Sequence, residues 1–374
     1  LLSLPEEELF TINQMGAMDK PGPKNGGFKL TEATTPLDSY LASAKLHAGF
    51  LMVDSKIKTT LRFIYGARFE SYQQKITNFD QITGDAVIKD TTFNNILPSI
   101  NAVWSMNEKM NLRAAYYRTV SRPEFRELAN FNFYDFILDY SVAGNPALSQ
   151  ATINNYDLRY EWYPGAGQLF SASVFYKDID NAIEQIAAGA SQIRSISYAN
   201  VKNVKNMGAE LEYRLKLSTL FKNDSSVFLN NLTLYTNLAY IKSKVDLSDI
   251  VGATERPMQG QSPYIFNAGL TYNITQFGLS TTLVYNVIGD RVAQVGTVGY
   301  GDIYERHRNL LDFSVSKKLG RKGEVKLTWG DILRPEFMYY QDNNASHKYE
   351  ADKDNVMQRL QLGSTITLSM GYKF

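Results

Sequence analysis

Aromatic side chains gather in several polar stretches of this chain, where no strand pattern is evident. Exposed loops are where binding residues concentrate, and rings there could stack on sugars, porphyrin-like or catecholate ligands alike. The candidate ligand contacts are Phe131, Phe133, Tyr134, Phe136, Tyr300, Tyr304, Phe337, Tyr339 and Tyr340. The same rings could equally pack on one another or on a neighbouring domain. They predict a binding surface but do not name its ligand.

Covalent chemistry has little support in the sequence. The three histidines, His47, His307 and His347, are far apart along the chain. There is no HExxH, GxSxG or glycine-rich phosphate loop, and with no cysteine there is no thiolate to ligate a metal. We therefore expect a protein that is not an enzyme, with no cofactor and no metal site.

Composition excludes two further classes of protein. The 374 residues include 39 basic and 38 acidic side chains, a net charge of +1 that gives no reason to expect nucleic acid. No apolar run approaches the roughly 18 residues of a membrane-spanning helix. Strands that cross a membrane remain allowed, because their alternating faces average to a mildly polar composition.

The last stretch of the chain shows the pattern that must position the loops. Its apolar residues Ile366, Leu368, Met370, Tyr372 and Phe374 recur at every second position, with small or polar residues between them. This alternation is typical of a strand whose two faces meet different surroundings. A terminal Phe with Tyr two residues earlier resembles the C-terminal signal of bacterial outer-membrane assembly. We predict that Met370, Tyr372 and Phe374 form this assembly signal.

The same alternation recurs about 13 times along the chain. The alternating apolar residues of the predicted strands lie within 40–52, 61–69, 100–106, 112–116, 156–162, 170–176, 209–217, 232–240, 266–272, 279–287, 311–315, 325–329 and 366–374. With the residues that flank these positions, the predicted strands run to roughly 9–13 residues, as a tilted membrane crossing requires. Their connections alternate between short turns and long polar loops. Residues 1–37 read as one such loop. The pattern favours an all-β fold, a transmembrane antiparallel β-barrel.

One face of each predicted strand is apolar and the other is charged. We expect Leu211 to face lipid, and Glu212 and His47 to face a wet lumen. Trp104 and Trp162 lie close to predicted short turns, as in the aromatic girdle of a barrel.

Two groups of charged residues have predicted structural roles. Lumen charges such as Arg62, Arg68 and Glu70 are expected to bond one another or a filling domain. The run Arg122–Pro123–Glu124 is expected to turn the chain out of a strand, with a fixed φ at the proline and a charge pair in the lumen.

An open set of about 13 strands would leave two unpaired edges, which the hydrocarbon region does not permit. The first residues, LLSLPEEELF, lack the basic, apolar and cleavage regions of a signal peptide. We therefore expect this sequence to be a fragment of a larger barrel protein.

Several stretches resemble the C-terminal barrel half of TonB-dependent receptors, especially those of Bacteroidota. In chain order they are IYGARFE ending at Glu70, SRPEFREL at 121–128, NFYDF at 132–136, GNPALSQATINNYDLRYEWYP at 144–164, SASVFYKDIDNAIEQ at 171–185, MGAELEYRLKL at 207–217, QSPYIFNAGLTYN at 261–273 and the terminal aromatic strand. The resemblance implies a barrel of about 22 strands filled by a plug domain. Residues 1–374 would be its C-terminal part, without the plug and the first strands.

The family implies a function and a set of partners. The protein would lie in the outer membrane and import a scarce nutrient, such as a siderophore, cobalamin, glycan or peptide. Its partners would be outer-membrane lipid, the TonB complex through a plug not present in this chain, the barrel assembly machinery through the C-terminal strand, and a surface lipoprotein. The alternatives are a passive porin-like channel and a soluble all-β binding module.

Overall fold

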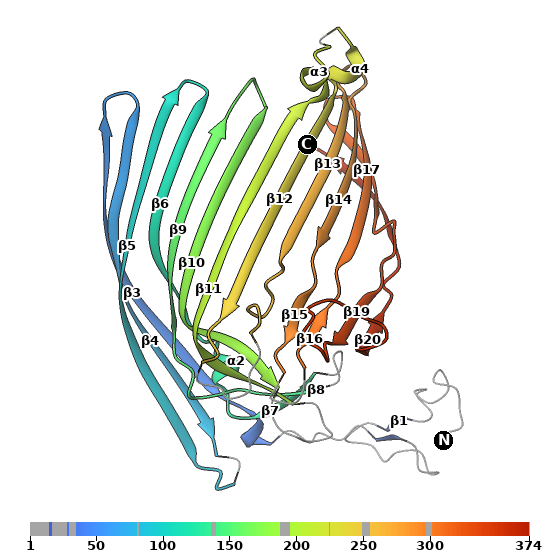
Figure 1. Ribbon diagram of the computed structural model, residues 1–374. Helices are drawn as coiled ribbons and strands as arrows, with labels where there is room; N and C mark the ends of the chain where they lie inside the picture. Colours follow the sequence, from blue (N-terminus) through green and yellow to red (C-terminus); the bar gives the residue numbers. More distant parts are fainter. Residues whose placement is uncertain are drawn as a thin grey trace.

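The computed structural model describes residues 15–16, 28–29, 35–80, 82–135, 140–187, 195–223, 225–248, 255–296 and 301–373. One large antiparallel sheet curves into a wall (Figure 1). Thirteen of its strands are neighbours in chain order: β3 (Leu41–Ile57), β4 (Leu61–Phe79), β5 (Ala86–Asn107), β6 (Met110–Ser121), β9 (Ala151–Trp162), β10 (Leu169–Ala187), β11 (Ser195–Lys216), β12 (Leu232–Val245), β13 (Tyr264–Ile274), β14 (Leu279–Ile288), β17 (Arg308–Leu319), β18 (Gly323–Gly330) and β21 (Thr365–Tyr372). The predicted fold class and strand number are confirmed.

The sheet is open at both ends. Among the described residues, β3 pairs with β4 alone and β21 pairs with β18 alone. Each edge strand therefore presents one row of backbone N–H and C=O groups that the described sheet does not pair.

Cross-strand pairing keeps the predicted apolar residues of β4 to β21 on one continuous face, which we call the outer face. Leu211 on this face is exposed and pairs with Ala172 and Leu238. The opposite, inner face carries Glu212, whose Oε2 accepts from Arg159 Nη2 at 2.9 Å. The predicted facing of Leu211 and Glu212 is confirmed.

Strand β3 corrects one part of that prediction. Phe50 pairs with Arg68 of the inner face, whereas Leu51 pairs with Ala67 of the outer face. The predicted apolar set of residues 40–52 therefore faces inward, and His47 lies on the outer side instead of facing the lumen. The reason is that β3 carries apolar residues on both faces, so its alternation does not determine its orientation.

Four strands run to about twice the length of a membrane crossing. β4, β5, β10 and β11 run for 19 to 22 residues, through polar stretches that were expected to be loops. In the β4–β5 extension, Gln73 Nε2 donates to Asp90 Oδ1 at 2.9 Å across the ladder. Beyond a membrane both faces of a strand meet water. The backbone ladder therefore continues after the apolar alternation has ended.

Short connections lie at one rim of the wall and long loops at the other, at the top and bottom of Figure 1. One connection breaks the predicted alternation of short turns and long loops. The connection between β11 and β12, residues 217–231, lies at the short-turn rim but is longer than the other turns there. It contains α3 (Leu217–Leu220) and α4 (Val227–Asn230). In the part of the chain that the structure describes, no helix is long and apolar enough to cross a membrane.

The long loops carry the remaining elements. These are β1 (Met15–Gly16), β2 (Phe28–Lys29), η1 (Pro36–Asp38), α2 (Phe125–Leu128), β7 (Asn132–Asp135), β8 (Tyr140–Ala143), β15 (Arg291–Gln294), β16 (Ile303–Glu305), β19 (Phe337–Gln341) and β20 (Asn355–Leu360), with η2 (Thr275–Phe277) in a short turn. β15, β16, β19 and β20 form a separate sheet in that order. The predicted loop 1–37 lies mostly outside the described residues, although β1 and β2 pair within it.

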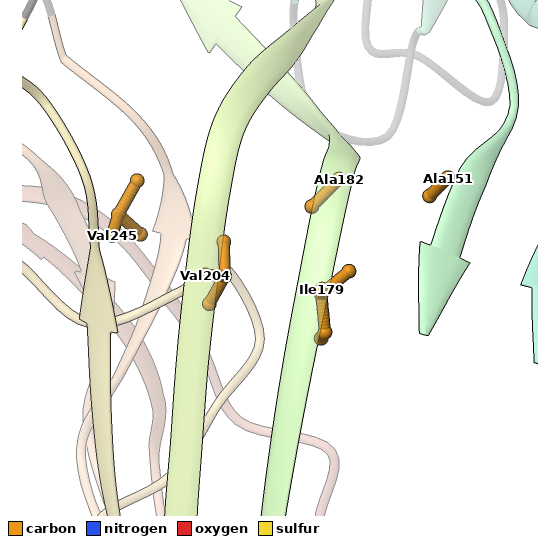
Figure 2. Close-up of a cluster of buried hydrophobic side chains, with 5 residues drawn as sticks. All are labelled: Ala151, Ile179, Ala182, Val204 and Val245. Atoms are coloured by element: carbon orange, nitrogen blue, oxygen red, sulfur yellow. The ribbon is translucent and has the colours of Figure 1, made fainter. Parts of the chain in front are cut away.

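Buried apolar side chains lie where the long loops meet the inner face. Figure 2 shows one cluster, formed by Ala151, Ile179, Ala182, Val204 and Val245 from four neighbouring strands. The partly buried Leu247 and Met258, from the segment that follows β12, pack against it. The loops therefore fold inward and attach to the wall through apolar contacts as well as hydrogen bonds.

Candidate functional site: a cavity among the long loops

The segment that leaves β6 turns inward at the SRPEFREL motif. The Arg122 guanidinium bonds the Glu70 carboxylate of the inner face, and Gln74 Nε2 donates to the Pro123 carbonyl at 2.8 Å. Glu124 is the N-cap residue of α2, and its N–H donates to the Glu127 carboxylate at 2.8 Å. These contacts confirm the structural role predicted for residues 122–124.

The GNP motif holds the same segment across the inner face. A Cβ on Gly144 would lie 2.2 Å from the Ala129 carbonyl oxygen, so only glycine fits this contact. The Asn145 N–H donates to the Glu127 carbonyl at 2.6 Å, and its Nδ2 donates to the Tyr198 carbonyl of β11 at 2.8 Å. The segment therefore bridges from β4 to β11.

A buried ion pair holds the segment of residues 255–262. Arg256 Nη2 lies 2.7 Å from Glu184 Oε2 and Nη1 lies 3.1 Å from Oε1, with the side chains 5% and 0% exposed. The Gln259 N–H donates to Glu184 Oε1 at 2.8 Å, and its Nε2 donates to the Ala293 carbonyl at 2.8 Å. A buried charge is tolerated only when it is paired and hydrogen-bonded. This pair therefore fixes the segment against β10 and β15.

Two stacked tyrosines form the core of the loop sheet. The rings of Tyr304 and Tyr340 are buried, with centroids 5.7 Å apart. Tyr340 OH donates to Asp290 Oδ2 at 2.9 Å, and His307 Nδ1 lies 2.7 Å from Asp290 Oδ1. Burial raises the pKa of both tyrosines above the ordinary tyrosine value. Asp290 joins the end of β14 to β16 and β19.

Where these three loop structures meet, they line an open cavity of about 420 Å³, within the range of small-molecule sites. Its polar lining comes from seven parts of the chain, including Glu184 and Gln185 of β10 and Glu305 of β16. Glu127 contributes from α2, Tyr198 from β11, Gln259 from the 255–262 segment, Arg291 from β15 and Tyr339 from β19.

The cavity wall offers both donors and acceptors. Burial raises the pKa of the Glu127 carboxyl and of the Tyr339 hydroxyl. Arg291 Nη2 donates to Glu305 Oε2 at 2.6 Å, so the cation at the wall is already paired. The arrangement suits a polar ligand held by hydrogen bonds. Across the described ranges, no group of three or more His, Cys, Asp or Glu side chains could hold a metal ion.

One predicted ligand contact lines this cavity, and others pack beside or beneath it. Tyr339 lies in its wall, and the Phe337 ring packs edge-on against Tyr339 at 5.0 Å between centroids. The Arg308 guanidinium lies 4.5 Å from the Phe337 ring centre. Tyr304 and Tyr340 are buried and stack on each other. These two residues therefore follow the alternative that the sequence left open, in which the aromatics pack on one another.

The aromatics of the 131–136 stretch lie in the segment after α2. The Phe131 ring stacks on Tyr40 at 6.0 Å, and the Arg126 guanidinium lies 3.5 Å from the Phe133 ring centre. Tyr134 is exposed. These rings do not line the cavity.

The predicted assembly signal is placed in part. Met370 and Tyr372 lie exposed on the outer face of β21, where they pair with residues of β18. Phe374 lies outside the described residues, as do the predicted ligand contacts Phe136 and Tyr300.

Several residues that line or support the cavity were not predicted as site residues from the sequence. Glu184 and Arg256 are 72 positions apart, so no local pattern joins them. Glu127 does fall inside the SRPEFREL motif, and Glu184 and Gln185 end the motif SASVFYKDIDNAIEQ. Those motifs are the sequence signal that pointed to this region.

The charged side chains of the inner face bond one another. This was one of the two predicted possibilities, the other being contact with a filling domain. Arg68 Nε donates to Glu70 Oε1 at 2.7 Å, and Arg62 Nε donates to Asp54 Oδ1 at 2.9 Å. The inner wall is therefore a charged, ion-paired surface opposite the apolar outer face.

Together these features define a membrane-spanning β-barrel wall whose long loops fold inward around a ligand-sized cavity. Residues 11–330 match the family model described as TonB dependent receptor-like, beta-barrel. The chain belongs to the TonB-dependent receptor β-barrel family.

Solved structures with the same fold include transporters and an uptake receptor. The ferric yersiniabactin uptake receptor of Yersinia pestis is 13% identical, with a TM-score of 0.61, and the match covers 90% of this chain and 46% of that one. The FrpB iron transporter of Neisseria meningitidis (F3-3 variant) is 15% identical, with a TM-score of 0.58, covering 89% and 45%. The copper transporter OprC is 16% identical, with a TM-score of 0.62, covering 89% and 48%.

The chain thus spans less than half the length of these solved structures. A comparison with curated protein sequences finds no match.

Proposed function

We propose that this chain is the C-terminal part of the barrel of a TonB-dependent importer in the outer membrane. Further strands would close the open edges at β3 and β21, and a plug domain would fill the lumen. The family match and the open thirteen-strand wall support this proposal. The protein would move its ligand without covalent chemistry.

The observation that carries the proposal is the cavity among the inward-folded loops. Its wall presents the Gln259 amide, the Tyr198 and Tyr339 hydroxyls and the Glu127 carboxyl. A ligand captured there would lie on the inner side of the wall, at the rim where an importer admits its cargo. The substrate class proposed is a scarce polar nutrient: a siderophore, cobalamin, glycan or peptide.

The proposed partners follow from the same architecture. The plug would receive energy from the TonB complex, and the exposed Tyr134 and the partly buried Phe337 would extend the ligand surface or contact a surface lipoprotein. Met370, Tyr372 and Phe374 would direct assembly of the barrel. The outer face would contact outer-membrane lipid.

Uptake measurements test the importer directly. Cells with and without the receptor are given a labelled ferric siderophore, cyanocobalamin, an oligosaccharide and a peptide, each with and without a protonophore. An importer predicts accumulation of one ligand that requires both the receptor and the proton gradient. A passive porin-like channel instead predicts receptor-dependent entry that ignores the protonophore. Extraction of the protein without detergent would indicate a soluble module.

The cavity is tested by substitution within its wall. Gln259→Ala and Tyr339→Ala should each reduce uptake of the identified ligand without reducing the amount of assembled receptor. Lys353→Ala is the matched control, because Lys353 is an exposed loop residue that does not line the cavity. Equal uptake by all three variants would show that the ligand binds elsewhere.

A further inference from the structure

The longer connection at the short-turn rim covers part of the outer face. Leu215 and Leu232 are in pairing register with outer-face residues, Leu234 and Tyr272. On a lipid-facing wall such side chains are exposed to the hydrocarbon. Here Leu215 is only 3% exposed and Leu232 only 8%. Protein must therefore lie over them on the outer side.

The covering protein is the connection of residues 217–223 and 225–231, which we call the outward connection. α3 contacts β11 and β12, and α4 contacts β12 (Figure 1). The Phe228 ring of α4 lies 5.1 Å from the Tyr272 ring of the outer face. The connection thus folds outward across the wall, away from the lumen.

The outward connection itself exposes large apolar side chains. Phe221 is 63% exposed and Val227 is 73% exposed, and Leu220 and Phe228 are also exposed. Neither α3 nor α4 carries a charged side chain. An exposed apolar surface of this size marks a site that contacts a membrane or another protein.

We propose that the outward connection is an interfacial lipid anchor, embedded at the boundary between headgroups and acyl chains on the short-turn side of the membrane. The argument for lipid is continuity. Phe228 extends the outer apolar face through Tyr272, and the exposed Trp104 and Trp162 also lie on the outer face near this rim. Aromatic and aliphatic groups at this depth partition into the interface.

The anchor would fix the depth of the wall at β11 and β12. Among its described residues, the outward connection has one exposed charged side chain, Lys222, between the two helices. The short turn around Lys322 exposes several charged side chains, so it is the comparison at the same rim.

Site-specific fluorescence tests the anchor in the assembled receptor. This chain contains no cysteine, so a Val227→Cys substitution gives one labelling position within it. The variant is labelled with the dye NBD and placed in phosphatidylcholine nanodiscs, some of which carry nitroxide lipids labelled near the headgroup. Lys322→Cys, in the charged turn at the same rim, is the control.

The anchor predicts blue-shifted emission at position 227 and several-fold stronger quenching by nitroxide lipid than at position 322. Aqueous iodide should quench position 322 several-fold more strongly. A Phe221→Cys label should behave like the one at 227, and circular dichroism should show the same sheet content in all three variants. Equal responses at 227, 221 and 322 would overturn the proposal. The proposal would also be overturned if iodide quenched the label at position 227 in nanodiscs but not in whole cell envelopes. That result would indicate that a protein partner, and not lipid, covers this position.

Discussion

An arginine placed on the outer face should cost far more than one placed on the inner face of the same strand. Val174 lies in the outer register of β10, between Phe170 and Tyr176, and is exposed. Val174→Arg would bury a charge in hydrocarbon, where the penalty near mid-membrane is about 2–4 kcal/mol. Its pairing partners Leu158 and Ala209 offer no counter-charge.

The adjacent Ser173 is the matched control for this substitution. Ser173 lies on the inner face, with its Oγ 3.3 Å from Glu210 Oε2. The guanidinium of Ser173→Arg would therefore meet a carboxylate and water, and such partly exposed pairs contribute within about 1 kcal/mol.

Denaturant unfolding of the receptor folded into lipid vesicles measures both variants. The expected result is a fall of roughly 30- to 700-fold in the folding equilibrium constant for Val174→Arg, since each 1.4 kcal/mol is tenfold. Ser173→Arg should change that constant by less than about fivefold. Equal losses at the two positions, or a larger loss at Ser173, would refute the assigned faces.

Three further outcomes are expected. Glu184→Gln leaves the buried Arg256 without its carboxylate, so the free energy of local opening of residues 255–262, measured by hydrogen exchange, should fall by about 3–5 kcal/mol. Glu255→Gln removes an exposed ion pair and should lower the same free energy by less than about 1 kcal/mol. Equal losses in the two variants would contradict a stabilising role of the buried pair. Burial raises the folded-state pKa of Glu127 above its unfolded value, so its contribution to stability is present below the unfolded pKa and is lost as pH rises through the folded pKa. Glu127→Gln should abolish this loss of exchange protection in the α2 region, and wild-type protection that instead increases with pH there would contradict the sign. Deleting Phe374 should reduce the heat-modifiable, membrane-assembled fraction, and unaltered assembly would exclude the signal.

The strand pattern was predictable where one face of the wall meets lipid and the other meets water. The outer residues from Tyr65 to Leu368 alternate because their surroundings alternate. Strand β3 was misassigned because Phe50 and Leu51 are both apolar, and no sequence period can choose between two apolar faces. The extended hairpins were missed because strands in water on both sides have no alternation to detect.

The site was predictable only as a region. The loop aromatics indicated the rim at which the cavity lies. Of the predicted contacts that the structure describes, Tyr339 lines the cavity, whereas Tyr304 and Tyr340 pack within the loop sheet. The pair of Glu184 and Arg256 depends on strand β10 meeting a loop segment 72 positions later. Such contacts arise from how the wall curves, which residue periodicity does not encode.

The intact mass of the native protein, extracted from its membrane, tests the central claim most directly. The claim is that this wall is the C-terminal part of a plugged importer, and the chain covers 45% to 48% of three solved structures of the same fold. It predicts a single polypeptide of roughly twice the 42.3 kDa of this chain. A native mass near 42.3 kDa would contradict the claim, because the two open edges at β3 and β21 would then need strands from other chains.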